Sequence, residues 1–320
     1  MTEVDARRRE HRRRGRLRQS LEGYAFLLPN FTGFAAFTFL PVVASFVLAF
    51  YSWDMMQEAR FIGLRNFINL LTSSEFWYYF YNTVFLMAGI PVGMALSLGM
   101  AMLVNQKLKG IVVFRTVYFL PHICVGVALY VLWVWIYNPE FGLFNQLIQF
   151  FTGVKGPAWL SDRFWAKPAL IIMGLWAGAG GKSMILYLAG LQGIDPSLYE
   201  VADIDGVGAW GKFRYITIPM LAPTSFFIFI MSVIEGFQGG FDQVIVMTGG
   251  GPPPGATTTI SYYIFTEAFE EQRMGYAAAV SWFLFLLVFA VTLINWRFGG
   301  RRVHYLDPVS LWLARVFHDP

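Results

Sequence analysis

The sequence predicts an all-α membrane protein with six transmembrane helices and both termini in the cytoplasm. Composition is the first observation behind this fold class: of 320 residues, 56% are hydrophobic and only 14% are charged, against about 25% charged in an average soluble domain. The second is length, because several apolar runs reach the roughly 20 residues that a helix needs to cross a bilayer. The third is the placement of basic residues, which sets the orientation.

A basic arm, residues 1–22, opens the chain with eight arginines. A basic block directly ahead of an apolar run keeps the N-terminus in the cytoplasm. We therefore interpret the arm as a topology signal and do not expect a nucleic-acid partner. The run from Tyr24 to Tyr51 is too long for a signal-peptide core and lacks a small-residue cleavage site at its end, so it is the first predicted span.

Five more spans complete a predicted six-span domain, residues 23–298. They are expected at about Trp77–Val104, Val112–Tyr137, Lys167–Leu191, Leu221–Gly240 and Tyr276–Arg297. The segments between spans at 52–76, 138–166 and 241–274 are then external, the first with a short helix near Leu64–Leu71 and the last too rich in Gly and Pro to be helical throughout. Residues 192–220 form a cytoplasmic loop, and residues 299–320 form a cytoplasmic tail with a short apolar helix at its end.

The distribution of Lys and Arg supports this orientation. Seventeen of the 24 basic residues fall on the predicted inner face, six fall outside, and Lys182 lies within a span. This bias has the sign that the positive-inside rule requires. The six outer residues are Arg60, Arg65, Lys155, Arg163, Lys167 and Arg273.

The sequence gives no catalytic or metal site. The segment Trp176–Ser183 resembles a phosphate-binding loop, but Trp176 stands where GxxxxGK[ST] requires glycine, and no strand precedes it. Four scattered histidines offer neither metal-ligand spacing nor a catalytic triad. The single cysteine, Cys124, has no disulfide partner in the chain. We expect neither enzyme activity nor a cofactor in this chain.

The inner loop has a helix–glycine–helix pattern. Asp195 and Pro196 form a good helix start, because Asp caps the first turn and Pro loses nothing at that position. We expect a helix over 196–205, with Leu198 and Ala202 on one face, and Gly206 as its left-handed C-terminal cap. A second helical piece, 209–217, is expected to end at Pro219. From physics alone, the pattern fits a rigid protrusion and an amphipathic connector equally well.

The same loop resembles a known motif. Glu200-Val-Ala-x-x-Asp205-Gly206, followed by Ile216-Thr-Ile-Pro219, is similar to the EAA loop of permease subunits in binding-protein-dependent ABC importers, with apolar-for-apolar departures at positions 201, 207 and 218. The resemblance to the carbohydrate branch, of maltose and glycerol-phosphate type, covers roughly residues 20–300. Its further motifs are Phe61-Ile-Gly-Leu-x-Asn66-Phe67, Leu188-Ala-Gly-Leu191, Met247-Thr-Gly-Gly-Gly-Pro252 and Gly275-Tyr-Ala-x-Ala279.

This resemblance implies the permease architecture of a type I ABC importer in a cell membrane. It implies that the loop docks in an ATPase dimer that binds ATP and Mg, that a second permease completes the path, and that an extracytoplasmic solute-binding protein delivers a sugar or sugar-like solute. It assigns the ATPase-coupling role to Glu200, Ala202, Asp205, Gly206 and Pro219.

Polar groups within or at the ends of the spans are candidates for the solute path, because ionisable groups in a membrane usually face a cavity or a partner. The alternative for each is a buried polar contact between helices or a position at the end of a span near water, and this alternative is favoured for Lys182 and Glu235 and more strongly for Asn82. The candidates are Lys182, Glu235, Gln238 and Asp242, with Gln243 and Asn82 beside them.

Other functions stay open from the residues alone. They are an ABC permease for a non-sugar solute, a secondary transporter or channel that works without an ATPase, and a structural or signalling membrane protein. The secondary transporter or channel would not require the EAA-like loop, and the structural or signalling protein would show no solute flux in any assembly.

Overall fold

The computed structural model describes residues 22–299, except positions 57, 107–109, 124, 125, 252 and 253. The basic arm up to residue 21, Lys107, Lys109, Cys124 and the tail beyond residue 299, with its predicted short helix, lie outside the described residues.

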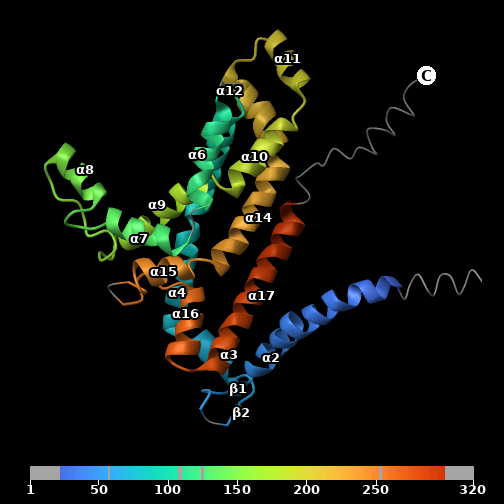
Figure 1. The fold of residues 1–320 in the computed structure, drawn as a ribbon, viewed down its shortest axis with the longest axis vertical. Coiled ribbons are helices and arrows are strands. Elements are labelled where there is room, and N and C mark those ends of the chain that lie inside the picture. Colours follow the sequence, from blue (N-terminus) through green and yellow to red (C-terminus); the bar gives the residue numbers. More distant parts are fainter. Residues whose placement is uncertain (1–21, 57, 107–109, 124–125, 252–253, 300–320) are drawn as a thin grey trace, which may run out of the picture.

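The described chain is a set of helices with one small hairpin (Figure 1). A first helix, Glu22–Leu48, contains a π-helical turn, η1 (Ala35–Phe39), and ends as α2 (Leu40–Leu48). The strands β1 (Tyr51–Ser52) and β2 (Arg60–Phe61) pair antiparallel after it.

The predicted end of the first span, at Tyr51, is wrong by three residues, because Tyr51 belongs to β1. The amide of Asn66 explains the early end of the helix. Its Nδ2 donates to the carbonyl oxygens of Ala49, at 2.9 Å, and Tyr51, at 3.0 Å. These carbonyls are therefore satisfied outside the helix. The hairpin is also a departure from the all-α prediction.

The remaining elements follow in chain order. The first half holds α3 (Arg65–Thr72), α4 (Ser74–Met87), α5 (Gly89–Val104), α6 (Ile111–Ile123), α7 (Val127–Ile136), α8 (Leu143–Thr152), α9 (Ala166–Ala179) and α10 (Lys182–Gln192). The second half holds α11 (Pro196–Ile204), α12 (Ala209–Lys212), η2 (Phe213–Thr217), α13 (Ile218–Met220), α14 (Ala222–Gln238), α15 (Phe241–Met247), α16 (Ile260–Phe265), η3 (Thr266–Glu270) and α17 (Met274–Gly299). The predicted short helix near Leu64–Leu71 is α3, whereas α8 was not predicted.

By length and composition, the described residues contain three helices that are long and apolar enough to cross a membrane, or up to six spans if each of three bent pairs counts as one. The three are Glu22–Leu48, Ser74–Val104 and Met274–Asn295, which match predicted spans one, two and six. Predicted spans three, four and five are not continuous: α6 meets α7 at 91°, α9 meets α10 at 43°, and the helix over Ala209–Met220 meets α14 at 62°.

Close packing accounts for the bend between α9 and α10. Gly180 and Gly181 separate these helices, and a side chain at position 180 would overlap the carbonyl oxygen of Tyr118 on α6. Only glycine lets two backbones approach this closely. Gly180 and Gly181 therefore allow α6 to pack against the bend.

The predicted helix end at Pro219 is wrong. Pro219 lies inside α13, and the break comes at Leu221, one residue before α14 begins. The residues just before it form the π-helical turn η2, in which hydrogen bonds span one residue more than in an α-helix. Pro219 has no N–H to donate to the series of helical hydrogen bonds. The turn η2 lies shortly before the position where this donor is missing.

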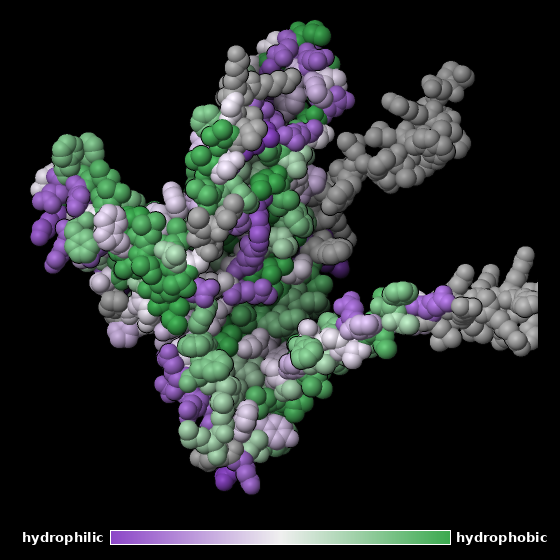
Figure 2. Space-filling view, viewed as in Figure 1, coloured by the Kyte–Doolittle hydropathy of each residue, from purple (hydrophilic) through white to green (hydrophobic). Residues whose placement is uncertain are grey.

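The core lies between the central helices: α5 packs against α9 and α10, while α14 packs against α4, α5 and α17. One buried aromatic group at α7, with Trp133, Tyr137 and Trp159, joins that helix to α9 and α15. Figure 2 shows apolar residues around the middle of the molecule, with hydrophilic residues gathered at the tip that carries α11 and at the opposite end near the hairpin. This pattern suits a protein that crosses a bilayer.

Candidate functional site

The loop that was predicted to be cytoplasmic forms a protruding tip, residues 195–217, at one end of the molecule (Figure 1). Its helix α11 begins as predicted: Asp195 Oδ1 accepts a hydrogen bond from the backbone N–H of Ser197 at 2.9 Å, and Pro196 is in the first turn. This backbone hydrogen bond lowers the pKa of the Asp195 carboxyl.

Gly206 ends α11 in the predicted left-handed conformation, with φ of +73°. The N–H of Val207 donates to the carbonyl oxygen of Ala202 at 2.8 Å, and the N–H of Gly206 donates to that of Asp203 at 3.1 Å. These two bonds form a Schellman cap, which requires a left-handed residue at the position of Gly206. The chain direction after α11 is therefore set by this glycine.

Two side-chain contacts across the glycine hold α11 against the next helices. Lys212 Nζ lies 2.6 Å from Asp203 Oδ1. The hydroxyl of Tyr199 shares a hydrogen bond of 2.9 Å with that of Thr217. Neither contact was predicted from the sequence, although opposite charges on either side of Gly206 could have indicated the first. The tip is a braced unit, which favours the rigid protrusion over the loose connector.

The outer surface of the tip is a mixture of exposed apolar and acidic side chains. Ile204 is 85% exposed and Trp210 is 73% exposed. Glu200 and Asp205 are also exposed, and within the part of the chain that the structure describes neither side-chain carboxylate makes an ion pair or a hydrogen bond. Such a surface, with unpaired carboxylates beside large apolar groups, is typical of a protein–protein contact.

The other predicted coupling residues have different positions. Ala202 is 7% exposed and faces the molecule, whereas Leu198, predicted on the same face, is 41% exposed. Ala202 therefore contributes close packing beneath the tip and its carbonyl to the cap. Pro219 is exposed in α13, below the tip.

A polar cavity of about 280 Å³ lies between α5, α9 and α14. One side of the cavity is polar, with Ser97, Ser183, Ser232, Glu235 and Gln243. Apolar side chains, among them Ile90, Met94, Ile171 and Leu175, line the rest together with glycines of α5 and α9. Gln243 is held by a hydrogen bond of 2.8 Å from its Nε2 to the carbonyl oxygen of Leu170. Ser232 precedes Glu235 by three residues and therefore lies on the same face of α14. This spacing could have identified Ser232 from the sequence.

Lys182 and Glu235, both predicted for the solute path, form an ion pair. Lys182 Nζ at the start of α10 lies 3.8 Å from Glu235 Oε1 on α14, and their side chains are 74% and 60% exposed. A pair this exposed adds little to stability when it faces water. The pair spans two helices at the edge of the polar cavity, and both charges remain accessible to a solute.

The other two predicted path residues do not join this cavity. Gln238 lies beside a separate apolar groove against α17, and Asp242 is exposed in the first turn of α15. Asn82 is fully buried, and its Nδ2 donates to the carbonyl oxygens of Gly255, at 2.8 Å, and Thr258, at 3.1 Å. Asn82 therefore makes a buried polar contact, as favoured from the sequence, but with the loop between α15 and α16 rather than with another helix.

Comparison with known proteins decides the family. Residues 89–302 match the model of the "binding-protein-dependent transport system inner membrane component" family. The chain belongs to this family. It is a permease subunit of a binding-protein-dependent ABC importer and a multi-pass membrane protein. A secondary transporter or channel is not favoured.

The chain is similar to permease proteins over most of its own length and most of theirs. The chain is 34% identical over 292 residues to the probable ABC transporter permease protein YesP of Bacillus subtilis, covering 90% of this chain and 93% of that protein. It is 36% identical over 281 residues to the lactose transport system permease protein LacF of Rhizobium radiobacter, covering 86% and 93%.

A solved structure gives the same fold. A chain of the bacterial alginate ABC transporter, in complex with its alginate pentasaccharide-bound periplasmic protein, superposes with a TM-score of 0.78 at 25% identity, covering 90% of this chain and 96% of that one. The chain therefore has the fold of an ABC importer permease.

Proposed function

We propose that this permease forms half of the translocation path for a sugar or sugar-like solute, and that ATP hydrolysis on a separate ATPase dimer drives it. The named substrates of its relatives, lactose and alginate, support the sugar class. A second permease, a different chain, would complete the path, and an extracytoplasmic solute-binding protein would deliver the solute. The lipid bilayer is the remaining partner.

The observation that carries the coupling proposal is the braced tip with unpaired carboxylates. A segment that transmits force between subunits must keep its conformation. The Schellman cap at Gly206 and the Asp203–Lys212 ion pair both restrain the conformation of the tip. Exposed Glu200 and Asp205 are available for basic groups on the ATPase, and Ile204 offers an apolar anchor. ATP and Mg would bind the ATPase, with no cofactor in this chain.

The orientation follows from this role. An ATPase uses cytoplasmic ATP, so the tip would face the cytoplasm and the hairpin end would face outward. Both termini would then lie on the cytoplasmic side, in agreement with the excess of basic residues predicted there.

Among the residues predicted for the solute path, Lys182 and Glu235 are the strongest candidates. They line or border a polar cavity inside the apolar belt, where charged groups are costly unless they serve a path or a partner. In a wider path within the assembled transporter, Gln238 and Asp242 would line the outer end.

Reconstitution tests the proposal. The permease pair, ATPase and binding protein are placed in proteoliposomes, and uptake of labelled sugars is measured with and without internal ATP. The expected result is ATP-dependent sugar uptake that is lost in Gly206→Pro, while Gly208→Ala, at an open position with negative φ, keeps it. Uptake without ATP, or equal uptake by both variants, would contradict the coupling role.

A further inference from the structure

The end of the molecule opposite the tip carries a cavity whose chemistry the solute path does not use. It has a volume of about 470 Å³ and lies between the start of α4, the glycine-rich loop after α15, and the α16–η3 segment. A second cavity of about 460 Å³ lies beside it and shares Glu75, Tyr263 and Arg273 with it. We call the two together the acidic socket.

Four carboxylates face the first cavity against a single basic side chain. Glu75 comes from α4, Glu267 and Glu270 from η3, and Glu271 follows directly. The basic residue is Arg273, whose Nη2 donates to Glu267 Oε1 at 2.8 Å. Because this pair neutralises itself, three carboxylates remain in the first cavity. The second cavity adds Asp54 and Arg65, whose charges offset each other, so the socket as a whole has an excess of negative charge.

Glu267 leaves one acceptor without a donor. Its side chain is 3% exposed, one oxygen is used by Arg273, and Oε2 is buried with no hydrogen-bond partner among the described residues. Burial raises the pKa of this carboxyl, which lies in η3, outside the membrane-spanning helix α17. A buried acceptor without a donor is costly. A group that brings N–H donors into the cavity would remove that cost.

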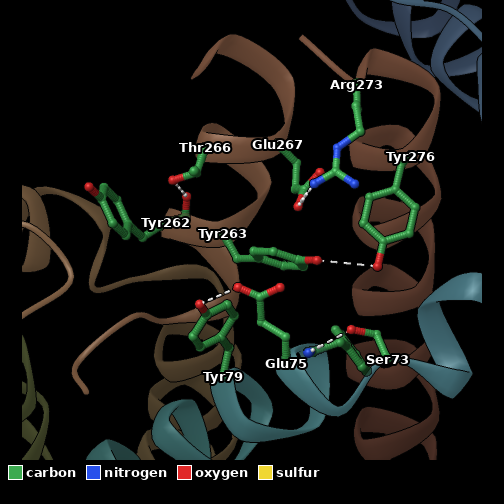
Figure 3. Close-up of polar contacts among 10 residues, drawn as sticks. Ser73, Glu75, Tyr79, Tyr262, Tyr263, Thr266, Glu267, Arg273 and Tyr276 are labelled. Carbon is green, nitrogen blue, oxygen red and sulfur yellow. Dashed lines mark hydrogen bonds and ion pairs between the residues drawn. The ribbon is translucent and has the colours of Figure 1, made fainter. Parts of the chain in front are cut away.

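Tyrosine rings form part of the wall beside these carboxylates. Figure 3 shows Glu75 between Tyr79 and Tyr263, with the hydroxyl of Tyr263 pointing to Tyr276. Tyr79 donates to Glu75 Oε1 at 2.6 Å, and the rings of Tyr79 and Tyr263 lie 5.0 Å apart. Tyr276 already carries a cation over its ring, the guanidinium of Arg273, at 5.6 Å. Aromatic faces beside carboxylates favour ammonium and guanidinium groups.

We propose that the acidic socket receives a lysine or arginine side chain of the solute-binding protein when that protein docks on the outer face. A neutral sugar is a poorer match, because it carries no positive charge to offset the excess of carboxylates. The cavity volume suits one or two side chains rather than a whole segment. This inference rests on the proposed function, since it assumes that a binding protein docks on the hairpin end.

Charge reversal tests the proposal. The assembled transporter is placed in nanodiscs, and the dissociation constant for fluorescently labelled binding protein is measured at two salt concentrations. Glu270→Lys with Glu271→Lys changes two exposed residues, so folding should be retained. We expect binding to weaken by about tenfold or more and to lose part of its salt dependence, because like charges would face each other.

Matched variants separate this site from general charge effects. Glu58→Lys with Glu140→Lys makes the same charge change at exposed positions that do not line the socket, and affinity should stay within about twofold. Glu270→Gln with Glu271→Gln should give a smaller loss of affinity than the lysine variant. If the socket variants bound the solute-binding protein with the same affinity as the wild type, the proposal that the socket receives one of its basic side chains would be contradicted. Failure of the wild-type transporter to bind the protein at all would instead contradict the proposed function.

Discussion

The two ends of this permease present acidic groups in opposite ways. At the tip, Glu200 and Asp205 are exposed and unpaired within the described chain, on helices braced by contacts between nearby residues such as Asp203 and Lys212. At the other end, Glu267 is buried, paired with Arg273, and surrounded by residues of α4 that precede it by almost two hundred positions. The tip is a rigid projection, and the socket is a cavity. This difference fits a tip that inserts into a partner and a socket into which a partner inserts.

The largest effect is expected at Gly206. Gly206→Pro cannot adopt φ of +73° and removes the N–H that donates to Asp203, so the Schellman cap is lost. We expect sugar uptake to fall below about a tenth of wild type, because a misdirected α11 cannot seat on the ATPase. Uptake assays with membrane levels measured by immunoblot check this. Near-normal uptake by a variant present at wild-type levels would break the contrast between a stiff tip and a receptive socket.

Glu200→Lys tests the charge of the tip rather than its shape. We expect about a tenfold loss of uptake, since truncation or reversal at a charged contact commonly costs more than 1 kcal/mol. Glu58→Lys makes the same charge change at the hairpin end and should leave ATPase stimulation unaltered. If both variants behaved alike, the carboxylate of Glu200 would have no special role.

Asn82→Leu tests the packing that supports the socket. The substitution leaves the carbonyl oxygens of Gly255 and Thr258 without their donor, at a cost of about 1–3 kcal/mol. Thermal unfolding in detergent should show a lower midpoint than in Asn69→Leu, which alters an exposed asparagine. Identical midpoints would mean that this contact does not hold the glycine-rich loop.

Glu235→Ala tests the polar cavity, the region between the two ends. We expect the KM for uptake to rise by up to about tenfold with unchanged assembly, because a hydrogen bond to a charged group contributes roughly 1.5–3 kcal/mol. The exchanged pair, Lys182→Glu with Glu235→Lys, separates two explanations. Recovery of uptake would indicate that the ion pair matters, and continued loss would indicate that the carboxylate itself meets the solute. Unchanged kinetics in Glu235→Ala would remove it from the path.

The smallest effect is expected from Glu267→Gln and depends on pH. Burial raises the pKa of Glu267 above its ordinary 4.5, so the folded protein binds this proton more tightly than the unfolded chain. The free energy of unfolding of the wild type should therefore fall, relative to the variant, as pH rises from about 4.5 through the raised pKa. Thermal unfolding across pH checks this, with Glu140→Gln as an exposed control. A wild-type-to-variant difference that does not change with pH would contradict it.

The contrast between the ends also explains what could be predicted from the sequence. The start of α11 and its glycine cap depend on residues a few positions apart, so Asp195, Pro196 and Gly206 predicted them correctly. Long apolar runs likewise predicted the helices Ser74–Val104 and α17. Lys182 and Glu235 were identified as unusual because charges are rare in apolar segments.

What failed depended on distant contacts. The end of the first helix is set by Asn66, and the bend between α9 and α10 is set by the approach of Tyr118. Neither appears as a local pattern. The socket was missed for the same reason, because Glu75 and Glu267 are ordinary loop carboxylates until the fold brings them to one cavity.

Site-directed crosslinking gives the most direct test that the tip is the place where ATPase energy enters. With Cys124 replaced by Ala, a cysteine is introduced by Ile204→Cys, at a side chain that is 85% exposed on α11, and in a control by Met56→Cys, 79% exposed near the hairpin. A short bifunctional reagent is applied to the assembled, active transporter. We predict that Ile204→Cys crosslinks to the ATPase subunit, in a yield that changes with ATP, and that Met56→Cys does not. An active transporter in which Ile204→Cys fails to reach the ATPase, or in which Met56→Cys reaches it, would contradict the account.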